Sequence, residues 1–313
     1  MKKLIYVFVL AIISMACAPY GELSKMEFSE LKYPFGVKYI TLDDGRTIAY
    51  ADKGEGKETI IFLHGLGSYM PAWQKNIPVL AQHFRTIAVD LPGYGKSSKE
   101  VHSGSMEFYA DVIIELADKL NLKKITIAGH SMGGQIAMVA ALKYPDRVSN
   151  LILIDPAGFE EFTPGEKEWF KEVMTVDGVA LTSNHQIRTN VYSNFYNMPD
   201  DAEFMITDRI ALKGAKEFKN YAYTVVQSVK GMVDEPVIDH LSKIKQRTLI
   251  IFGEDDQLIP NRYLHPGFTK DIAEIGRSKI RNSILVMIPE CGHFAQFEKP
   301  GVVNDEIIKF LTK

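Results

Sequence analysis

Residues 125–134 (ITIAGHSMGG) constrain the fold of this chain more than any other stretch. A β-branched apolar run leads into a G-x-S-x-G turn centred on Ser131, and helix-forming residues follow it. So sharp a turn brings backbone segments close together, which glycine permits because it has no side chain. The turn pushes the serine hydroxyl outward, and the amino end of the following helix favours negative charge beside it. The stretch therefore predicts a strand, a tight turn with an exposed nucleophile, and a helix.

Two later stretches offer partners for this serine. A serine hydroxyl needs a base to take its proton and an acid to orient that base. His293 follows the apolar run 284–288, so we expect it in a loop just past a buried strand. Asp255 and Asp256 follow a similar run, 248–252, and would lie at the same edge of the sheet.

The remaining chain alternates buried apolar runs with helical stretches, which predicts a mainly parallel sheet covered by helices on both faces. A hairpin is expected at residues 39–50, a helix at 108–120, and strands at 59–63, 85–89, 124–128, 150–154, 247–252 and 283–288. The rhythm breaks between about residues 158 and 236, a stretch too long for an ordinary crossover and rich in aromatic residues. We expect a helical cap there, inserted after the sixth strand and roofing the serine.

Several motifs in one order strengthen this interpretation. Residues 64–67 (HGLG), 90–97 (DLPGYGKS), 129–134 (GHSMGG), 253–260 (GEDDQLIP) and 292–293 (GH) resemble those of the α/β-hydrolase superfamily. The chain looks most similar to its capped esterases, lipases and carbon–carbon bond hydrolases. The resemblance implies an α/β-hydrolase fold, with core residues 36–157 and 237–313 around a cap at 158–236.

The resemblance also implies roles for particular residues. Ser131 would be the nucleophile, His293 the base, and Asp256 the acid, because Asp256 occupies the acid position of G-x-x-D-x-x-x-P. Asp255, one residue out of register, is an alternative acid. Asp155 is a third candidate because some relatives take their acid after that strand, although we expect an exposed or backbone-capping aspartate there.

A negative charge that develops on a substrate carbonyl needs fixed donors. The resemblance implies the backbone N–H groups of Leu66 and Met132 for this oxyanion hole. His64 would brace the loop that carries Leu66. His130 either lines the pocket or packs beside the turn.

Bulk composition excludes several other classes of protein. The chain has 313 residues, 46% of them apolar, which suits one sizeable core with an insertion. Its net charge of −3 offers no basic footprint for nucleic acid. H-E-x-x-H, paired cysteines, a complete phosphate loop and G-x-G-x-x-G after a strand are all missing from the sequence. We therefore expect no metal, no cofactor and no disulfide framework, and a monomer.

The first residues have the form of an export signal. Lys2 and Lys3 precede the apolar run 4–13, and Cys17 follows it, as at the end of a bacterial lipoprotein signal. We expect a signal peptide over residues 1–16, a tether over 17–35 and a lipid on Cys17, which places the protein at the bacterial cell envelope. The alternative is a soluble periplasmic or secreted protein with an unmodified Cys17.

These observations favour a serine hydrolase that cleaves a small carboxylic ester through an acyl-enzyme intermediate. The alternative within the superfamily is hydrolysis of a carbon–carbon bond in vinylogous diketones, because residues 291–298 resemble those enzymes. Phe294 and His130 depart from their pattern, which has tryptophan and asparagine at these positions. A binding module without turnover is disfavoured because all three expected triad residues are present.

Overall fold

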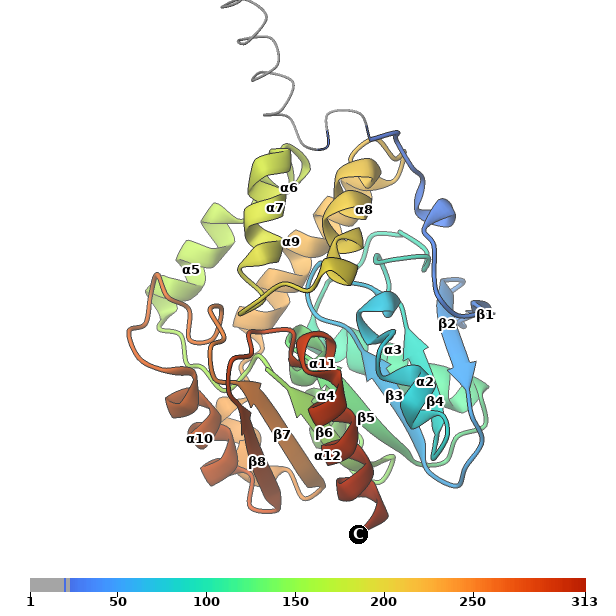
Figure 1. Ribbon diagram of the computed structural model, residues 1–313, viewed down its shortest axis with the longest axis vertical. Helices are drawn as coiled ribbons and strands as arrows, with labels where there is room; N and C mark the ends of the chain where they lie inside the picture. The colour runs from blue at the N-terminus through green and yellow to red at the C-terminus, as the bar shows by residue number, and fades with distance from the viewer. Residues whose placement is uncertain (1–19, 21–22) are drawn as a thin grey trace, which may run out of the picture.

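The computed structural model describes Tyr20 and residues 23–313 (Figure 1). Its centre is an eight-stranded sheet with the strand order β1-β2-β4-β3-β5-β6-β7-β8. The strands are β1 (Lys38–Thr41), β2 (Thr47–Lys53), β3 (Thr59–Leu63), β4 (Arg85–Val89), β5 (Ile125–His130), β6 (Val148–Ile154), β7 (Arg247–Gly253) and β8 (Ser283–Ile288). The expected signal peptide and Cys17 lie outside the described residues.

The sheet is parallel from β4 to β8, and only the β1–β2 hairpin and the β2–β4 pair are antiparallel. Strands β3 and β5 are buried along their whole length, as parallel strands covered on both faces must be. Parallel strands end at the same edge, so the loops after β3, β5, β7 and β8 gather at one end of the sheet. The predicted α/β-hydrolase fold is confirmed.

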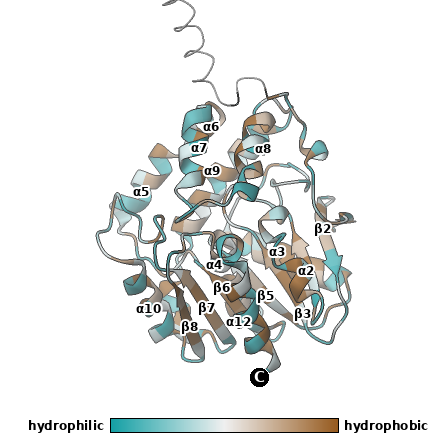
Figure 2. Cartoon of the chain, in the orientation of Figure 1, coloured by the Kyte–Doolittle hydropathy of each residue, from teal (hydrophilic) through white to brown (hydrophobic). Residues whose placement is uncertain are grey.

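Helices cover both faces of the sheet because successive side chains of a strand point to opposite sides. Ile61 belongs to one apolar core and its neighbours Ile60 and Phe62 to the other. The first core is covered by α3 (Met106–Lys119), α4 (Met132–Lys143) and α10 (Thr269–Lys279). The second is covered by α2 (Ile77–Leu80), α11 (Ala295–Glu298) and α12 (Pro300–Thr312). Figure 2 shows the hydrophobic residues concentrated on the central strands.

A helical cap lies between β6 and β7, over the end of the sheet where the loops gather (Figure 1). Its helices are α5 (Pro164–Val173), α6 (Val176–Ala180), α7 (Asn184–Tyr192), α8 (Phe204–Leu212) and α9 (Phe218–Asp234).

Short 3-10 helices occur along the described chain: η1 (Phe28–Glu30), η2 (Met70–Trp73), η3 (Asp200–Ala202) and η4 (Ile238–Lys243). Within the described residues, no helix combines the length and apolar character needed to span a membrane.

Candidate active site

Ser131 sits at a strained turn between β5 and α4, with φ 53° and ψ −118°. For a non-glycine residue such a conformation costs on the order of 1–3 kcal/mol and persists only where the surroundings impose it. The flanking positions must be glycine because no room is left for a Cβ atom. A Cβ on Gly129 would lie 2.1 Å from the Gly133 carbonyl oxygen, and one on Gly133 would lie 2.4 Å from the Leu63 oxygen. The tight approach therefore holds the serine out from the backbone.

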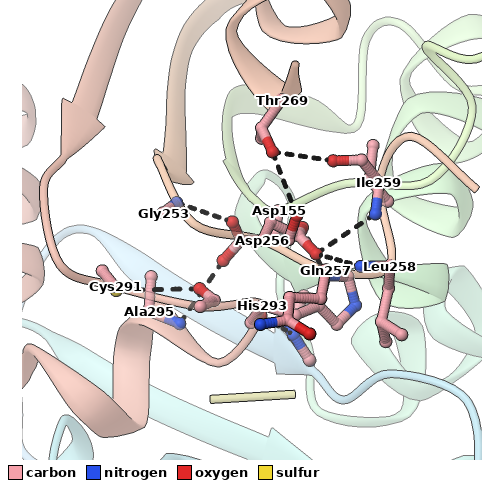
Figure 3. Close-up of polar contacts among 12 residues, drawn as sticks. Asp155, Gly253, Asp256, Gln257, Leu258, Ile259, Thr269, Cys291, His293 and Ala295 are labelled. Carbon is pink, nitrogen blue, oxygen red and sulfur yellow. Dashed lines mark hydrogen bonds and ion pairs between the residues drawn. The ribbon is translucent and has the colours of Figure 1, made fainter. Parts of the chain in front are cut away.

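His293 and Asp256 form a buried pair, with Asp155 nearby (Figure 3). The His293 Nδ1–H donates to Asp256 Oδ2 at 2.7 Å. The other oxygen of Asp256 accepts the N–H groups of Leu258 at 2.7 Å and Ile259 at 3.1 Å. Because the carboxylate accepts the Nδ1–H hydrogen bond, it favours the imidazole tautomer whose Nε2 carries a free lone pair. The pair thus provides an oriented base.

Ser131 and His293 line one cavity of about 730 Å³ between the sheet and the cap. His293 makes its side-chain hydrogen bond to Asp256 and none to Ser131 in this structure. In the absence of substrate such catalytic hydrogen bonds are often long, and they tighten in the complex. The structure thus gathers all three expected side chains at one edge of the sheet, while their roles stay a prediction.

The two alternative acids lie in different surroundings. Asp255 is exposed, and its backbone N–H donates to the Cys291 oxygen at 2.9 Å. Asp155 is fully buried rather than exposed, and it caps backbone groups, accepting the Gly253 N–H at 2.8 Å and the Ala295 N–H at 3.4 Å. Burial first, and then the neighbouring Asp256 carboxylate, raise the pKa of Asp155 well above its usual value. Neither side chain hydrogen-bonds His293.

Within the described residues, one group of three potential metal ligands has its ligating atoms all within 4.8 Å of one another: Asp155, Asp256 and His293. The carboxylate oxygens already have hydrogen-bond partners: backbone N–H groups for Asp155, and backbone N–H groups and the imidazole for Asp256. The donor set therefore suits a hydrogen-bonded site better than a cation, and the expected lack of a metal stays a prediction.

The expected oxyanion donors come from two separate segments of the chain. Leu66 follows β3 and Met132 opens α4, and in the described part of the chain neither N–H donates to a partner. His64 braces the first loop, because its Nδ1–H donates to the Gly65 oxygen at 2.8 Å and its Nε2 accepts the Leu91 N–H at 3.1 Å. Burial lowers the pKa of His64 to about 4, so it is neutral at pH 7.

His130 both lines the cavity and packs beside the turn. Its Nε2–H donates to the His293 carbonyl oxygen at 2.7 Å, and its ring lies 4.4 Å from that of Phe294. Burial lowers the pKa of His130 well below its usual value. The neutral ring therefore supports the loop that carries His293.

The cap contributes residues that the sequence did not single out. Arg209 and Lys167 are the cationic side chains that line the cavity within the described chain. The Arg209 guanidinium donates to the Gly67 oxygen and lies 4.9 Å from the centre of the Tyr221 ring. No motif marks these residues, because which side of a cap helix faces the substrate depends on tertiary packing.

Comparisons with known proteins agree with this fold. A model of the α/β-hydrolase fold family matches residues 58–300. A 2-hydroxy-6-oxononadienedioate/2-hydroxy-6-oxononatrienedioate hydrolase of Pseudomonas putida is 32% identical over 88% of this chain and 96% of its own. A probable hydrolytic enzyme of Pseudomonas aeruginosa has a TM-score of 0.81 at 24% identity, covering 92% of this chain and 99% of its own. An esterase of Exiguobacterium antarcticum has a TM-score of 0.74 at 23% identity, covering 88% and 99%.

Proposed function

This chain belongs to the α/β-hydrolase fold family, and we propose that it is a serine hydrolase that attacks the carbonyl carbon of a small acyl compound. One observation carries the proposal. Ser131, held outward at a strained turn, lines the same cavity as His293, whose imidazole is oriented by the buried Asp256. A nucleophile, a base and an orienting acid are the parts that acyl transfer requires.

The reaction follows from these positions. Ser131 Oγ attacks the carbonyl carbon while its proton moves to His293 Nε2, and Asp256 stabilises the resulting imidazolium. The free N–H groups of Leu66 and Met132 donate hydrogen bonds to the carbonyl oxygen and stabilise the negative charge that develops on it. His293 then protonates the leaving group, which departs and leaves an acyl group on Ser131. His293 then deprotonates a water molecule, which attacks the carbonyl carbon of the acyl group. The carboxylic acid leaves, and Ser131 regains its proton from His293.

Carbon–carbon hydrolysis is the candidate reaction that the curated relatives favour. The name of the Pseudomonas putida relative gives a dienedioate as its substrate, and a dienedioate is a dicarboxylate. Such a substrate needs cations in the cavity, and Arg209 and Lys167 supply two. These relatives support this alternative better than the ester hydrolysis that the sequence placed first.

Ester hydrolysis is the candidate that the cavity wall favours. Much of the cap side of the cavity is apolar and suits an uncharged acyl chain. The side chains concerned include Phe170, Ile187, Val191, Leu212, Val229 and Met232. Solved esterases share the fold, although this likeness says nothing of the bond cleaved.

One parallel assay decides between them. The purified full chain, Ser131→Ala and Arg209→Ala are each given p-nitrophenyl butyrate and a 2-hydroxy-6-oxo-dienedioate. We expect Ser131→Ala to lose on the order of 10⁴-fold in kcat on whichever substrate is turned over. If the diacid is the substrate, Arg209→Ala raises the KM for the diacid more than it changes the ester reaction. Full activity of Ser131→Ala on either compound would refute the proposed function.

A further inference from the structure

Large apolar side chains are exposed on the cap. Leu181, just after α6, is 79% exposed, and Val173, at the end of α5, is 49% exposed. Trp169 lies one helical turn before Val173, and Leu23 lies in the segment that enters the cap; both are exposed. We call these four residues the cap face. Exposed apolar side chains that lie close together mark an interaction surface, and Trp169 and Val173 share one side of α5, one helical turn apart.

The described N-terminal segment is fixed to the cap beside this face. The Tyr20 hydroxyl donates to a Glu203 carboxylate oxygen at 2.5 Å, and the Met26 N–H donates to the Ala211 oxygen at 3.2 Å. Glu203 precedes α8 and Ala211 lies near its end, so the segment runs along this helix. Phe28 then reaches the cavity wall. This part of the expected tether is therefore a wall of the cap.

The same end of α8 holds the loop after α6. Lys213 Nζ donates to the Thr182 oxygen at 2.7 Å, which ties the loop to the end of α8. The Lys25 side chain packs against Gly214, one residue further on. The exposed residues of the N-terminal segment and of the α6 loop consequently flank one end of one helix.

Part of the exposed lining of the cavity lies on this side of the cap. Its exposed lining residues include Val173, Thr175, Gly178 and Asn190, all on or between α5, α6 and α7. Val173 thus belongs both to the cap face and to the cavity. A molecule held against the cap face would meet the mouth of the cavity that leads to Ser131.

Chain length sets how far this face can lie from a membrane. An extended chain spans at most about 3.5 Å per residue, so the three steps from Cys17 to Tyr20 cover at most about 10 Å. The apolar run 4–13 lies seven residues or more before Tyr20. A lipid on Cys17 would therefore hold Tyr20, and the segment that follows it along α8, close to a bilayer.

We propose that the cap face docks on a lipid bilayer and that the cavity takes an acyl substrate dissolved in that bilayer. The substrate part rests on the proposed function. The apolar mouth and walls then provide a continuous path from the lipid to Ser131, so that the acyl chain does not cross water.

Tryptophan fluorescence tests the docking. The full chain has two tryptophans, and Trp73 is fully buried, so Trp169→Phe removes the exposed one. In that background, Leu181→Trp adds one exposed tryptophan on the cap, and Ile284→Trp is the matched control. Ile284 is 53% exposed and lies near the start of β8, at the opposite edge of the sheet from the cap. The proteins are reconstituted in vesicles of brominated phosphatidylcholine. Leu181→Trp should lose roughly half of its added emission, since interfacial side chains lie about 5–10 Å deep, and Ile284→Trp should keep its own. Equal quenching of both, quenching of neither, or failure of the chain to float with the vesicles overturns the docking.

Kinetics test the substrate route separately. Trp169→Ser/Leu181→Ser should lower hydrolysis of vesicle-borne p-nitrophenyl palmitate by about tenfold and leave p-nitrophenyl butyrate in water unchanged. Ile284→Ser is the matched control and should alter neither rate. A parallel fall in both rates, or no fall in either, overturns the route. If the parent chain hydrolyses neither ester, the proposed ester reaction fails, and the quenching result still decides the docking.

Discussion

Replacing Asp256 by asparagine should disable the base without disturbing its position. One carboxylate oxygen of Asp256 accepts two backbone N–H groups, at 2.7 Å and 3.1 Å. Those donors require an oxygen, so an asparagine amide must turn its NH₂ group toward His293. The amide then donates to Nδ1 and moves the imidazole proton to Nε2. With Nε2 protonated, His293 has no lone pair for the Ser131 proton.

The magnitude follows from this wrong tautomer. In serine hydrolases such a change lowers kcat on the order of 10⁴-fold, or about 5 kcal/mol of transition-state stabilisation. Steady-state kinetics on the active substrate should show this fall in kcat with KM within a few-fold, because Asp256 itself does not line the cavity. Thermal unfolding should change little, since the backbone contacts of the amide oxygen persist.

Asp155→Asn is the matched control. Asp155 contacts backbone N–H groups only, and an asparagine keeps an oxygen for the Gly253 N–H at 2.8 Å. We expect its kcat to stay within about tenfold of the parent, which is the cost of one weakened hydrogen bond. A larger loss in Asp155→Asn than in Asp256→Asn would refute the choice of acid and the argument from tautomers.

Further predictions concern stability. Burial lowers the pKa of His64 from 6.5 to about 4, so the folded protein resists protonation of this side chain. The stability that neutral His64 contributes is therefore complete above pH 6.5 and is lost as the pH falls toward 4. His64→Gln should weaken the pH dependence of the unfolding free energy between pH 7 and 4 by at most about 3 kcal/mol, measured by urea denaturation; an unchanged pH dependence would contradict this. Gly276→Ala should destabilise by about 1–3 kcal/mol despite its helical position, because the new Cβ would lie 2.1 Å from the buried Phe159 ring. Gly165→Ala, with nothing within 4 Å, is the control, and equal stability of the two variants would count against the packing argument.

Much of the fold could be predicted from sequence because its signals are local. The strand expected at 59–63 is β3 without change, and the helix expected at 108–120 is α3, Met106–Lys119. Parallel central strands are apolar on both faces, so their runs stand out even without neighbours. The insertion after β6 was visible because the alternation of runs stopped there.

The site residues that lie in local sequence motifs could be predicted, and those placed by tertiary packing could not. Ser131, Asp256 and His293 each follow a strand in a recognisable motif, so their meeting at one edge could be predicted. The burial of Asp155 could not, because a single aspartate after a strand looks alike whether its loop is exposed or covered. Arg209 was missed for a related reason, since its place in the cavity wall depends on how α8 packs over the loop after β3.

Covalent capture of the acyl group tests the central claim most directly. The parent chain is mixed with its active substrate or with a fluorophosphonate, quenched in acid within the first turnover, and digested for mass spectrometry. The added mass should lie on Ser131 alone, and Ser131→Ala should carry none and be inactive. Turnover without a label on Ser131, or a label on another residue together with an active Ser131→Ala, would contradict the account.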